Sequence, residues 1–425
     1  MTTVFLSTLL KHPVRDQHGR ELGTLSDVIV TLPADGYPAV TGLLLAPGDR
    51  DVFVGADRIT AVTDGSIQLA DATVDLRSFT RREGEVLLRA DVLGHRLLDP
   101  ERARLVRAYD VVLTPSGRGW TVTGVDVHRS TVWQRITDHT DHQIRDWAGF
   151  VALIGHTPSS GHRGLLARLR GLKPAQIADL LEGATPAEQA EILHHVHTDP
   201  DLEADVFEEL DDDRQARLLA TRSDTEIAAV LAHMNADDAA DALTDLPQDR
   251  RRPVLDTLPE PQRRQVTTLL GYAHHTAGGL MTLDVVTLPG DTSAAEALAA
   301  VRAARGLQPQ ALTSVYVFDE QQRLAGALTL VALVQADAAA TVGDLADPDP
   351  IRVLPDTDPI EITRLMADYN LLTLPVVDAG NRLLGVITVD DALEAAIPDN
   401  WRQRQHDTVL VPDPDTAPSG PETEQ

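Results

Sequence analysis

The chain has 425 residues, no cysteine and a formal net charge of −28, and these numbers exclude several classes of protein. One hydrophobic core cannot organise a chain of this length, so we expect about three domains. Such an acidic chain repels phosphate backbones, which argues against nucleic acid as a partner and favours cations, although acidity also serves solubility alone. The lack of cysteine excludes disulfides and thiolate metal sites and leaves hard oxygen ligands.

The sequence has no pattern that is typical of a secreted or membrane-spanning protein. The N-terminal stretch MTTVFLSTLLKH has no basic region ahead of a long apolar core and no small-residue cleavage site, so it is not typical of a signal peptide. The longest near-apolar runs, such as residues 324–334, are shorter than the roughly 20 residues that a membrane helix needs. We expect a cytoplasmic protein with no membrane insertion, which reaches a membrane only through a partner.

Short apolar strands and dense turn residues fill the N-terminal part, which predicts a small β-barrel over residues 1–80. A looser second pass starts at Val86, so residues 81–135 are predicted to form a related β unit. Residues 136–164, which end in a Gly/Ser-rich stretch, are interpreted as a linker. The phrase VRDQHGRELGTLSDVIV resembles a PRC-barrel domain, and this resemblance implies a docking module without a common chemistry.

Residues 165–271 carry apolar residues at helical spacing and repeated capping signals. Thr185-Pro186-Ala187-Glu188 and Ser223-Asp224-Thr225-Glu226 each place a hydroxyl cap three residues before a glutamate. Similar segments begin at Ala178, Ala204 and Ala228, which indicates stacked short helices in a superhelical array.

A joint at residues 272–282 precedes two copies of one unit, at residues 283–345 and 346–400, and an acidic Pro-rich tail follows at residues 401–425. The two copies align at a constant offset of 59, which places Asp319 on Asp378, Gly326 on Gly385 and Thr329 on Thr388. Each copy resembles a CBS domain. The phrase AGGLMT in the joint, with the helices before it, resembles the cytosolic region of MgtE magnesium channels. The expected fold is therefore a multidomain α+β fold: a PRC-like barrel, a helical repeat domain and a tandem α/β CBS pair.

Two aspartates in the helical region are candidates for a cation site. Asp237 and Asp241 are four residues apart, so on a helix beginning near Asn235 they project from one face on successive turns. Mg²⁺ takes oxygen ligands and needs only one or two carboxylates. The alternative is a solvated acidic face. The resemblance to MgtE implies regulatory Mg²⁺ between the helical domain and the CBS pair, and it adds Asp368 and Asp390 as metal candidates on the CBS side.

One departure from the MgtE pattern concerns the choice of ion. His274 and His275 stand in the joint where the family carries acids. Imidazole is a poor Mg²⁺ ligand and a good transition-metal ligand, so Mn²⁺ is the alternative cation. The other interpretation is that both are surface histidines at a helix end.

A second constellation is typical of nucleotide binding. Residues 385–391 contain G-x-x-T-x-x-D, by which CBS domains hold ATP or AMP; the resemblance implies that Thr388 faces phosphate and that Asp391 faces the ribose hydroxyls. The alternative is that Thr388 caps the next helix and that Asp391 completes its capping box. Both interpretations are compatible. The first copy has Ala332 in place of the acid, so at most one good site is expected in the pair.

The sequence contains no nucleophile–base pairing, Walker loop or dinucleotide fingerprint, so we expect no enzyme activity. The resemblance implies a cytosolic Mg²⁺-sensing regulator of the MgtE family that lacks the channel, controls a separate membrane metal transporter and forms a homodimer through its CBS domains. The alternatives are an adenine-nucleotide-binding regulator and an adaptor with no metal role. Asp237, Asp241 and Asp368 matter in the first reading, Thr388 and Asp391 in the second.

Overall fold

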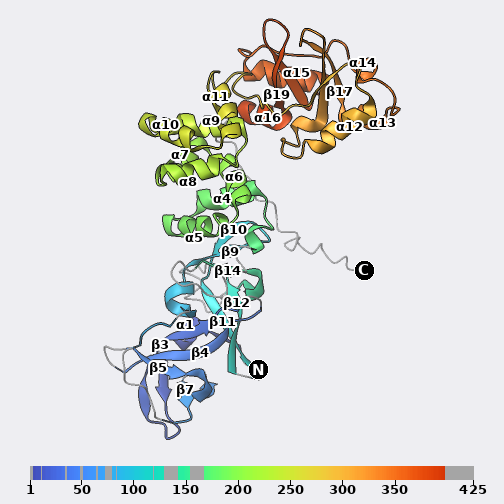
Figure 1. The fold of residues 1–425 in the computed structure, drawn as a ribbon. Coiled ribbons are helices and arrows are strands. Elements are labelled where there is room, and N and C mark those ends of the chain that lie inside the picture. The colour runs from blue at the N-terminus through green and yellow to red at the C-terminus, as the bar shows by residue number, and fades with distance from the viewer. Residues whose placement is uncertain are drawn as a thin grey trace, which may run out of the picture. The chain divides into compact units, whose positions relative to one another are not determined.

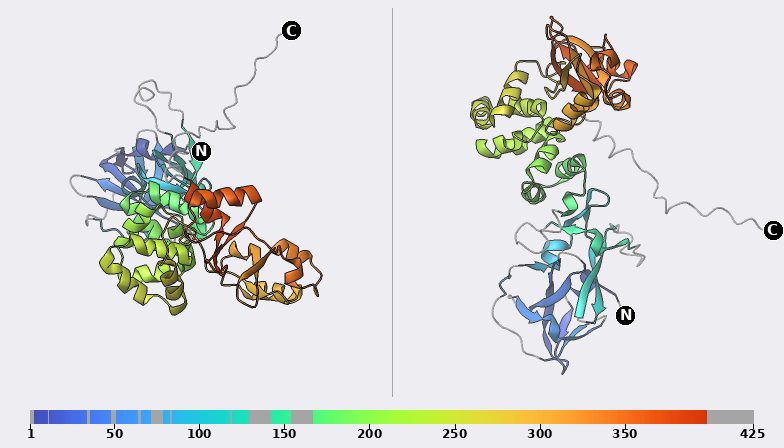
Figure 2. Two further views of the ribbon diagram at one scale, coloured as in Figure 1. Left: turned by 90° about the horizontal axis from the view of Figure 1, so that it is seen from above. Right: turned by 45° about the vertical axis from the view of Figure 1, so that its right-hand side comes forward.

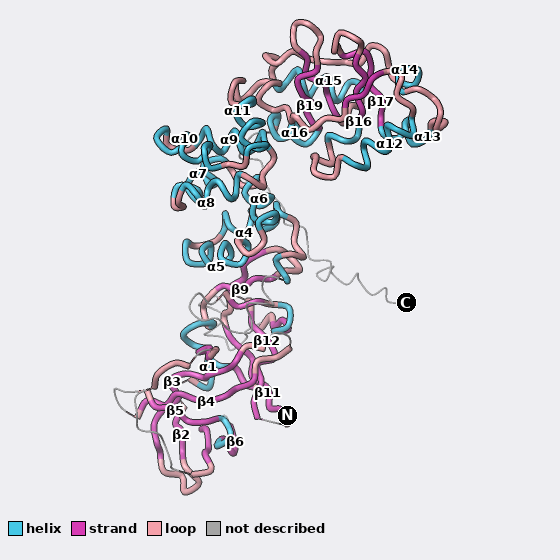
Figure 3. The backbone as a smooth tube through the Cα atoms, viewed as in Figure 1, coloured by secondary structure: helices cyan, strands magenta, loops and turns pink. Residues whose placement is uncertain are grey.

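The computed structural model describes residues 3–10, 12–33, 36–47, 51–63, 66–71, 79–82, 84–117, 119–128, 142–153 and 167–397. The chain divides into two compact units, Met1–Leu210 and Asp211–Gln425. Strands dominate the first part of the chain, a run of short helices follows, and the last part mixes helices with short strands (Figures 1 and 3). A multidomain α+β fold, as predicted from the sequence, is confirmed.

The N-terminal module, residues 3–153, is built around a large curled sheet. Among its described residues eleven strands join in the order β1-β11-β12-β4-β3-β2-β7-β6, with β13 on β12, β5 on β4 and β8 on β3. A second, three-stranded sheet has the order β10-β9-β14. The strands are β1 Val4–Phe5, β2 Pro13–Arg15, β3 Glu21–Thr31, β4 Ala39–Ala46, β5 Val52–Gly55, β6 Ile59–Thr63, β7 Ser66–Leu69, β8 Glu85–Leu87, β9 Arg96–Asp99, β10 Arg104–Arg107, β11 Asp110–Ser116, β12 Gly119–Asp126, β13 Ile144–Asp146 and β14 Val151–Ala152.

Short helical turns connect these strands, namely α1 Leu6–Leu9, η1 Ala56–Arg58, η2 Leu88–Val92 and η3 Trp147–Gly149. One apolar core runs through the whole module and contains Leu6, Val30, Leu88 and Val125. Because residues 1–80 and 81–135 share this core and one sheet, they form a single structural body. The likeness to PRC barrels remains a prediction.

The module consists of two halves that exchange their leading segments. Asp27 accepts backbone N–H groups from Val28 and Ala90, and Asp110 accepts them from Val111 and Ser7. These positions correspond at a constant offset of 83 (110 minus 27), and each acid holds the first turn of the other half. The strands follow the same rule, since β1 pairs with β11 and β8 pairs with β3. The two halves therefore depend on each other for their hydrogen bonds.

The segment interpreted as a linker contributes to this module. Strand β13 pairs with β12, and β14 pairs with β9. Trp147 and Phe150 lie between these strands and are 5% and 4% exposed. A short apolar stretch after a polar one carries little periodicity, so only its pairing with distant strands identifies it as part of the module. Residues 136–141 and 154–164 of the predicted linker lie outside the described residues.

The helical region contains pairs of short helices. The first unit holds α4 Pro174–Gly183, α5 Pro186–Val196 and α6 Pro200–Glu208, and the second unit holds α7 Asp212–Ala220, α8 Asp224–Leu231, α9 Ala236–Asp245, α10 Gln248–Thr257 and α11 Glu260–Leu269. The predicted capping boxes at Thr185 and Ser223 are confirmed. The three repeated segments start within α4, within α6 and within α8, so each repeat spans two helices.

The second unit continues into the CBS pair (Figure 2). Its first copy contains β15 Thr287–Pro289, α12 Ala294–Ala303, η4 Ala311–Thr313, β16 Ser314–Phe318, β17 Leu324–Thr329, α13 Leu330–Gln335 and α14 Val342–Leu345. Its second copy contains α15 Pro359–Tyr369, β18 Thr373–Val377, β19 Leu383–Thr388 and α16 Val389–Ala396.

The turn between the paired strands confirms the offset of 59. Asp319 and Asp378 each accept two backbone N–H groups across this turn. Gln322 and Asn381 follow at equivalent positions with left-handed φ angles of 62° and 61°. The same local hydrogen bonds therefore build both hairpins.

The two copies meet around equivalent residues and exchange strands. Thr373 donates a hydrogen bond of 3.0 Å to Ser314, its counterpart in the first copy, and the buried Tyr316 hydroxyl donates one of 2.9 Å to Thr373. Thr282, which precedes the first copy, pairs with Val386 in the second. Asp347, which precedes the second copy, pairs with Ala327 in the first. Each copy is thus completed by a segment that leads into the other.

None of the helices in the described ranges is both long enough and apolar enough to span a bilayer.

Candidate functional site

The candidate site lies in the second unit, where the joint connects the helical region to the CBS pair. The joint is firmly attached to the second CBS copy. Ala277 donates to the carbonyl of Thr357, Gly278 donates to the carbonyl of Pro355, and Thr282 exchanges two hydrogen bonds with Val386. These bonds hold the joint along the edge of that copy.

The two glycines of the joint permit close packing. A Cβ on Gly278 would lie 2.5 Å from the Tyr272 ring, and a Cβ on Gly279 would lie 2.5 Å from the carbonyl oxygens of Ala273 and His274. Both glycines are buried. The sequence suggested a point where the backbone bends, whereas the structure gives these glycines a steric role, because no other residue fits so close to a neighbouring backbone.

Helix α9 positions the two aspartates predicted from their spacing. Asp237 lies in its first turn and is only 5% exposed, and Asp241 follows one turn later. The N-terminus of a helix favours negative charge, which offsets part of the cost of burying Asp237. Its neighbours on α9 are buried alanines, so this helix lies close to whatever covers it.

The charge of Asp237 affects the pKa of Asp391, which lies on α16 of the second CBS copy. Burial, and after it the Asp237 carboxylate, raise the pKa of Asp391 to about 8. Hydrogen bonds from the Thr388 hydroxyl and N–H groups act in the opposite direction. The charge of Asp237 on α9 thus reaches the carboxyl group of Asp391 on α16, and burial disfavours the ionised form of Asp391. A cation between them would relieve both the burial and the repulsion.

Asp241 has a different neighbour. Its Oδ1 lies 3.0 Å from Nδ1 of His274. Burial raises the pKa of Asp241 although His274 opposes this shift, and the hydrogen bond with Asp241 raises the pKa of His274. Both shifts favour retention of protons at this pair. The imidazole is therefore the partner of Asp241 Oδ1.

The other two predicted metal residues lie on the surface. Asp368 is exposed near the end of α15, 3.7 Å from Arg364 on the same helix. Asp390 is exposed at the start of α16 and contributes to the raised pKa of its neighbour Asp391. In the ranges that the structure describes, no three or more His, Asp or Glu side chains are arranged to hold a metal ion.

These positions separate two donor sets. Asp237 and Asp391 supply only carboxylate oxygens, which fit Mg²⁺, since this ion keeps several waters and needs one or two carboxylates. The Asp241–His274 pair does not fit Mg²⁺, because imidazole suits transition metals. The sequence assigned Asp391 to nucleotide alone and missed its nearness to Asp237. The spacing along the chain contains no signal for that, because the two residues are more than 150 positions apart.

The two CBS copies differ at the helix that follows the paired strands. In the first copy the Thr329 hydroxyl accepts the N–H of Ala332, which is an ordinary helix cap. In the second copy the Thr388 hydroxyl donates to the Asp391 carboxylate instead. Thr388 is 1% exposed. Asp391 therefore accepts hydrogen bonds from the N-cap residue of its own helix, and its carboxyl group is also the one whose pKa the charge of Asp237 raises.

Comparison with known proteins finds matches for about half of this chain. The model of the MgtE intracellular N domain matches residues 172–275, and the CBS domain model matches residues 277–339 and 342–397. The crystal structure of the cytosolic domain of the Mg²⁺ channel MgtE in complex with ATP is 32% identical, with a TM-score of 0.51, over 55% of this chain and 94% of that chain. The chain belongs to the MgtE family.

Two curated MgtE proteins show how much of a full-length relative is matched. The magnesium transporter MgtE of Thermus thermophilus is 40% identical over 129 residues, which is 30% of this chain and 28% of that protein. The magnesium transporter MgtE of Bacillus subtilis is 29% identical over 132 residues, which is 31% of this chain and 29% of that protein. The chain thus spans under a third of the length of the curated MgtE proteins that it matches. It is homologous to the MgtE cytosolic region.

Proposed function

We propose that this MgtE-family chain is a divalent-cation sensor, with Mg²⁺ as the first candidate and Mn²⁺ as the alternative. The observation that carries the proposal is that the buried Asp237 on α9 lies close enough to Asp391 on α16 for its charge to raise the pKa of Asp391. A bound cation would keep both carboxylates ionised and would hold the two helices together. Its role is regulatory and not catalytic.

The proposed response is a shift between two arrangements of the second unit. With the cation bound, α9 and α16 stay together; without it, the two acids either share a proton or separate. A ligand that binds one of two states better shifts the population toward that state. Because the joint is hydrogen bonded to the second CBS copy, any separation has to begin between α9 and α16.

The proposed target is a separate membrane metal transporter, which the N-terminal module or the CBS pair would contact. This proposal follows from the relatives, which are named magnesium transporters. We further propose that the chain is cytoplasmic and forms a homodimer through its CBS domains, and that it reaches the membrane only through its partner.

Calorimetric titration of the full chain with Mg²⁺, and separately with Mn²⁺, tests the sensor. We expect binding that is weakened at least tenfold by Asp237→Asn and by Asp391→Asn, since each substitution removes half of the carboxylate pair. Asp256→Asn is the control, because Asp256 is exposed on α10 and pairs with Arg252 on the same helix. Equal binding of the ion by the Asp237→Asn variant would refute the site.

The second candidate function is adenine-nucleotide binding at Thr388 and Asp391, and the relative crystallised with ATP favours it. The Thr388–Asp391 contact already brings together the hydroxyl and the carboxylate that the sequence predicted for this purpose. Titration with ATP and AMP, each with and without Mg²⁺, separates the two functions. Nucleotide binding that survives Asp237→Asn but not Asp391→Ala would favour this candidate over the cation sensor.

A further inference from the structure

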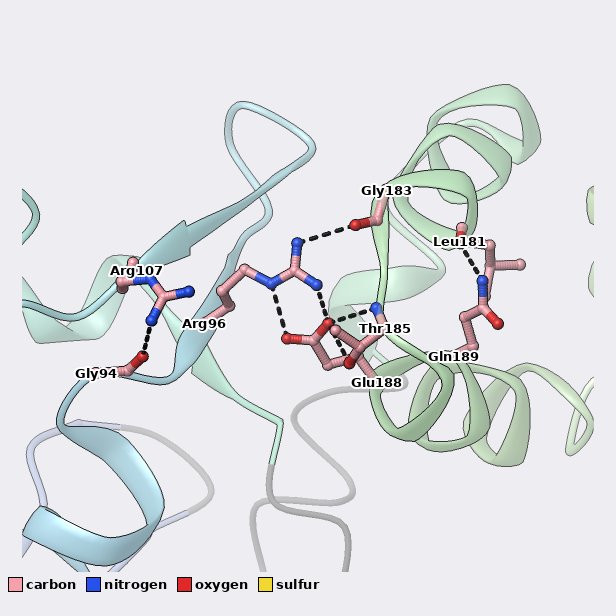
Figure 4. A network of polar contacts seen from close by, with 8 residues as sticks. All are labelled: Gly94, Arg96, Arg107, Leu181, Gly183, Thr185, Glu188 and Gln189. Carbon is pink, nitrogen blue, oxygen red and sulfur yellow. Dashed lines mark hydrogen bonds and ion pairs between the residues drawn. The ribbon is translucent and has the colours of Figure 1, made fainter.

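Arg96 connects the N-terminal module with helices α4 and α5. Arg96 stands at the start of β9 and points between α4 and α5, as Figure 4 shows. Its Nη1 donates a hydrogen bond of 2.9 Å to the carbonyl of Gly183, the last residue of α4. Its Nε donates one of 2.9 Å to Glu188 Oε1, and its Nη2 pairs with Glu188 Oε2.

This geometry lets one side chain hold two helix ends. The last carbonyls of a helix have no partner within the helix and carry partial negative charge, which a guanidinium satisfies. The fork of the guanidinium matches both oxygens of a carboxylate, so the contact with Glu188 fixes direction as well as distance. A lysine at position 96 could not reproduce both contacts.

Glu188 is itself tied to the start of α5. Its Oε2 accepts the Thr185 N–H at 2.7 Å and the Thr185 hydroxyl at 2.8 Å, which completes a capping box. Burial raises the pKa of the Glu188 carboxyl, but the hydrogen bonds from Arg96 and Thr185 outweigh it and leave the pKa below its ordinary value. The Arg96 and Glu188 side chains are only 25% and 16% exposed. A half-buried, bidentate pair is less screened than a surface ion pair.

The base of Arg96 is equally well fixed. Strand β9 lies between β10 and β14, and Leu97 and Leu98 beside Arg96 are buried. At the other end of β9 the fully buried Asp99 is bonded to Arg145 at 2.5 Å.

A second contact joins the module to the segment before α4. Arg168 in this segment donates a hydrogen bond of 2.8 Å to the carbonyl of Ala148 in the module.

We propose that Arg96 makes the N-terminal module and helices α4 and α5 one rigid body, so that a partner held by the module is held at a fixed orientation to these helices. The module is then attached rigidly to α4 and α5 and is not a domain on a free tether. This inference does not depend on which ligand the joint binds.

The absence of cysteine allows a direct test by spin labelling of the full chain. Labels at Gln68→Cys on β7 and Ala190→Cys on α5, both exposed positions, report the distance between the module and the helix. We expect one narrow distance peak in the otherwise native chain and loss of that narrow peak in Arg96→Gln. Arg104→Gln is the matched control, because Arg104 lies on the adjacent strand and pairs only within the module.

Glu188→Gln provides a second variant in which the helix start is preserved. Glutamine serves in a capping box, so α5 keeps its N-terminus while the charge opposite Arg96 is lost. We expect a broadening smaller than that of Arg96→Gln, with unchanged helical circular dichroism. A broad distribution in the native background, an unchanged peak in Arg96→Gln, or equal broadening in Arg104→Gln would overturn the proposal.

Discussion

The N-terminal module and the CBS pair are both internal repeats. They differ in whether an acid occurs at the equivalent position of both halves. In the module both halves keep the acid, since Asp27 and Asp110 each bind the first turn of the other half. In the CBS pair only the second copy has an acid at the repeated position, Asp391, while the first has Ala332. Both repeats also exchange strands between their halves.

This difference separates structural acids from candidate functional ones. An acid that satisfies backbone N–H groups of the opposite half is needed twice, because both halves have the same orphan donors. The helix start in the first CBS copy is already capped by the Thr329 hydroxyl, so an acid there is dispensable. Asp391 lies in the copy whose helix is near Asp237, and its burial and the charge of Asp237 raise the pKa of its carboxyl group.

The largest expected effect is at Asp110 in the module. Its carboxylate accepts the Ser7 N–H at 3.0 Å, the Val111 N–H at 2.8 Å and the Ser7 hydroxyl. Asp110→Ala would leave buried donors without partners and should lower the free energy of unfolding by about 4 kcal/mol. Urea unfolding of the module, with Asp110→Asn as the milder control, measures this. A loss below about 1 kcal/mol would show that the exchanged segments do not need the acid.

The partner acid Asp27 predicts a pH dependence. Burial raises its pKa to about 6 from an ordinary 3.8, despite hydrogen bonds from the backbone N–H groups of Arg89, Val28 and Ala90. Below pH 4 both folded and unfolded chains hold the proton, so the contribution is complete there. As the pH rises from 4 to 6 the unfolded chain releases its proton first, and up to about 3 kcal/mol of stability is lost.

Comparison with Asp27→Asn isolates this contribution, because asparagine does not titrate. Thermal unfolding of the native and substituted chains at pH 4.5, 5.5 and 7 should show a native stability that falls relative to the variant across this range. A difference that stays constant with pH would mean that the three backbone donors keep Asp27 ionised throughout.

The glycines of the two CBS copies give the next test. A Cβ on Gly385 would lie 2.5 Å from the Thr282 carbonyl oxygen, whereas a Cβ on its counterpart Gly326 would lie 2.8 Å from the Ala346 methyl group and 3.1 Å from the Asp347 carbonyl oxygen. The shorter contact requires the larger shift, so we expect Gly385→Ala to cost about 2 kcal/mol and Gly326→Ala about half of that. Chemical unfolding of the two variants in parallel measures the ratio. Equal costs would show that the joint shifts freely away from the second copy.

The smallest expected effect comes from restoring the missing acid in the first copy. Ala332→Asp places a carboxylate in the first turn of α13, where the helix dipole should stabilise it by about 0.5 kcal/mol. Nuclear magnetic resonance titration of the introduced carboxyl should give an ordinary pKa, in contrast to Asp391. A strongly raised pKa there would mean that the fold of the CBS copy, and not the presence of Asp237, perturbs this position.

The sequence alone determined the elements that depend on neighbours along the chain. The helix starts at Thr185 and Ser223, the helix pairs at regular spacing and the CBS repeat at an offset of 59 all follow from capping chemistry and periodicity over a few residues. The spacing of Asp237 and Asp241 placed both on α9 for the same reason. These features depend on neighbouring residues in the chain and not on how the helices pack.

Only the tertiary structure decided which of these residues meet. Three features join segments that are far apart in sequence: the effect of the Asp237 charge on Asp391, the pairing of Asp241 with His274, and the inclusion of β13 and β14 in the N-terminal module. Periodicity reports the face of an element that is buried, but it does not report what covers that face. The steric role of Gly278 and Gly279 was hidden for the same reason, because the sequence shows that a backbone can bend there, and packing alone shows that it must fit closely.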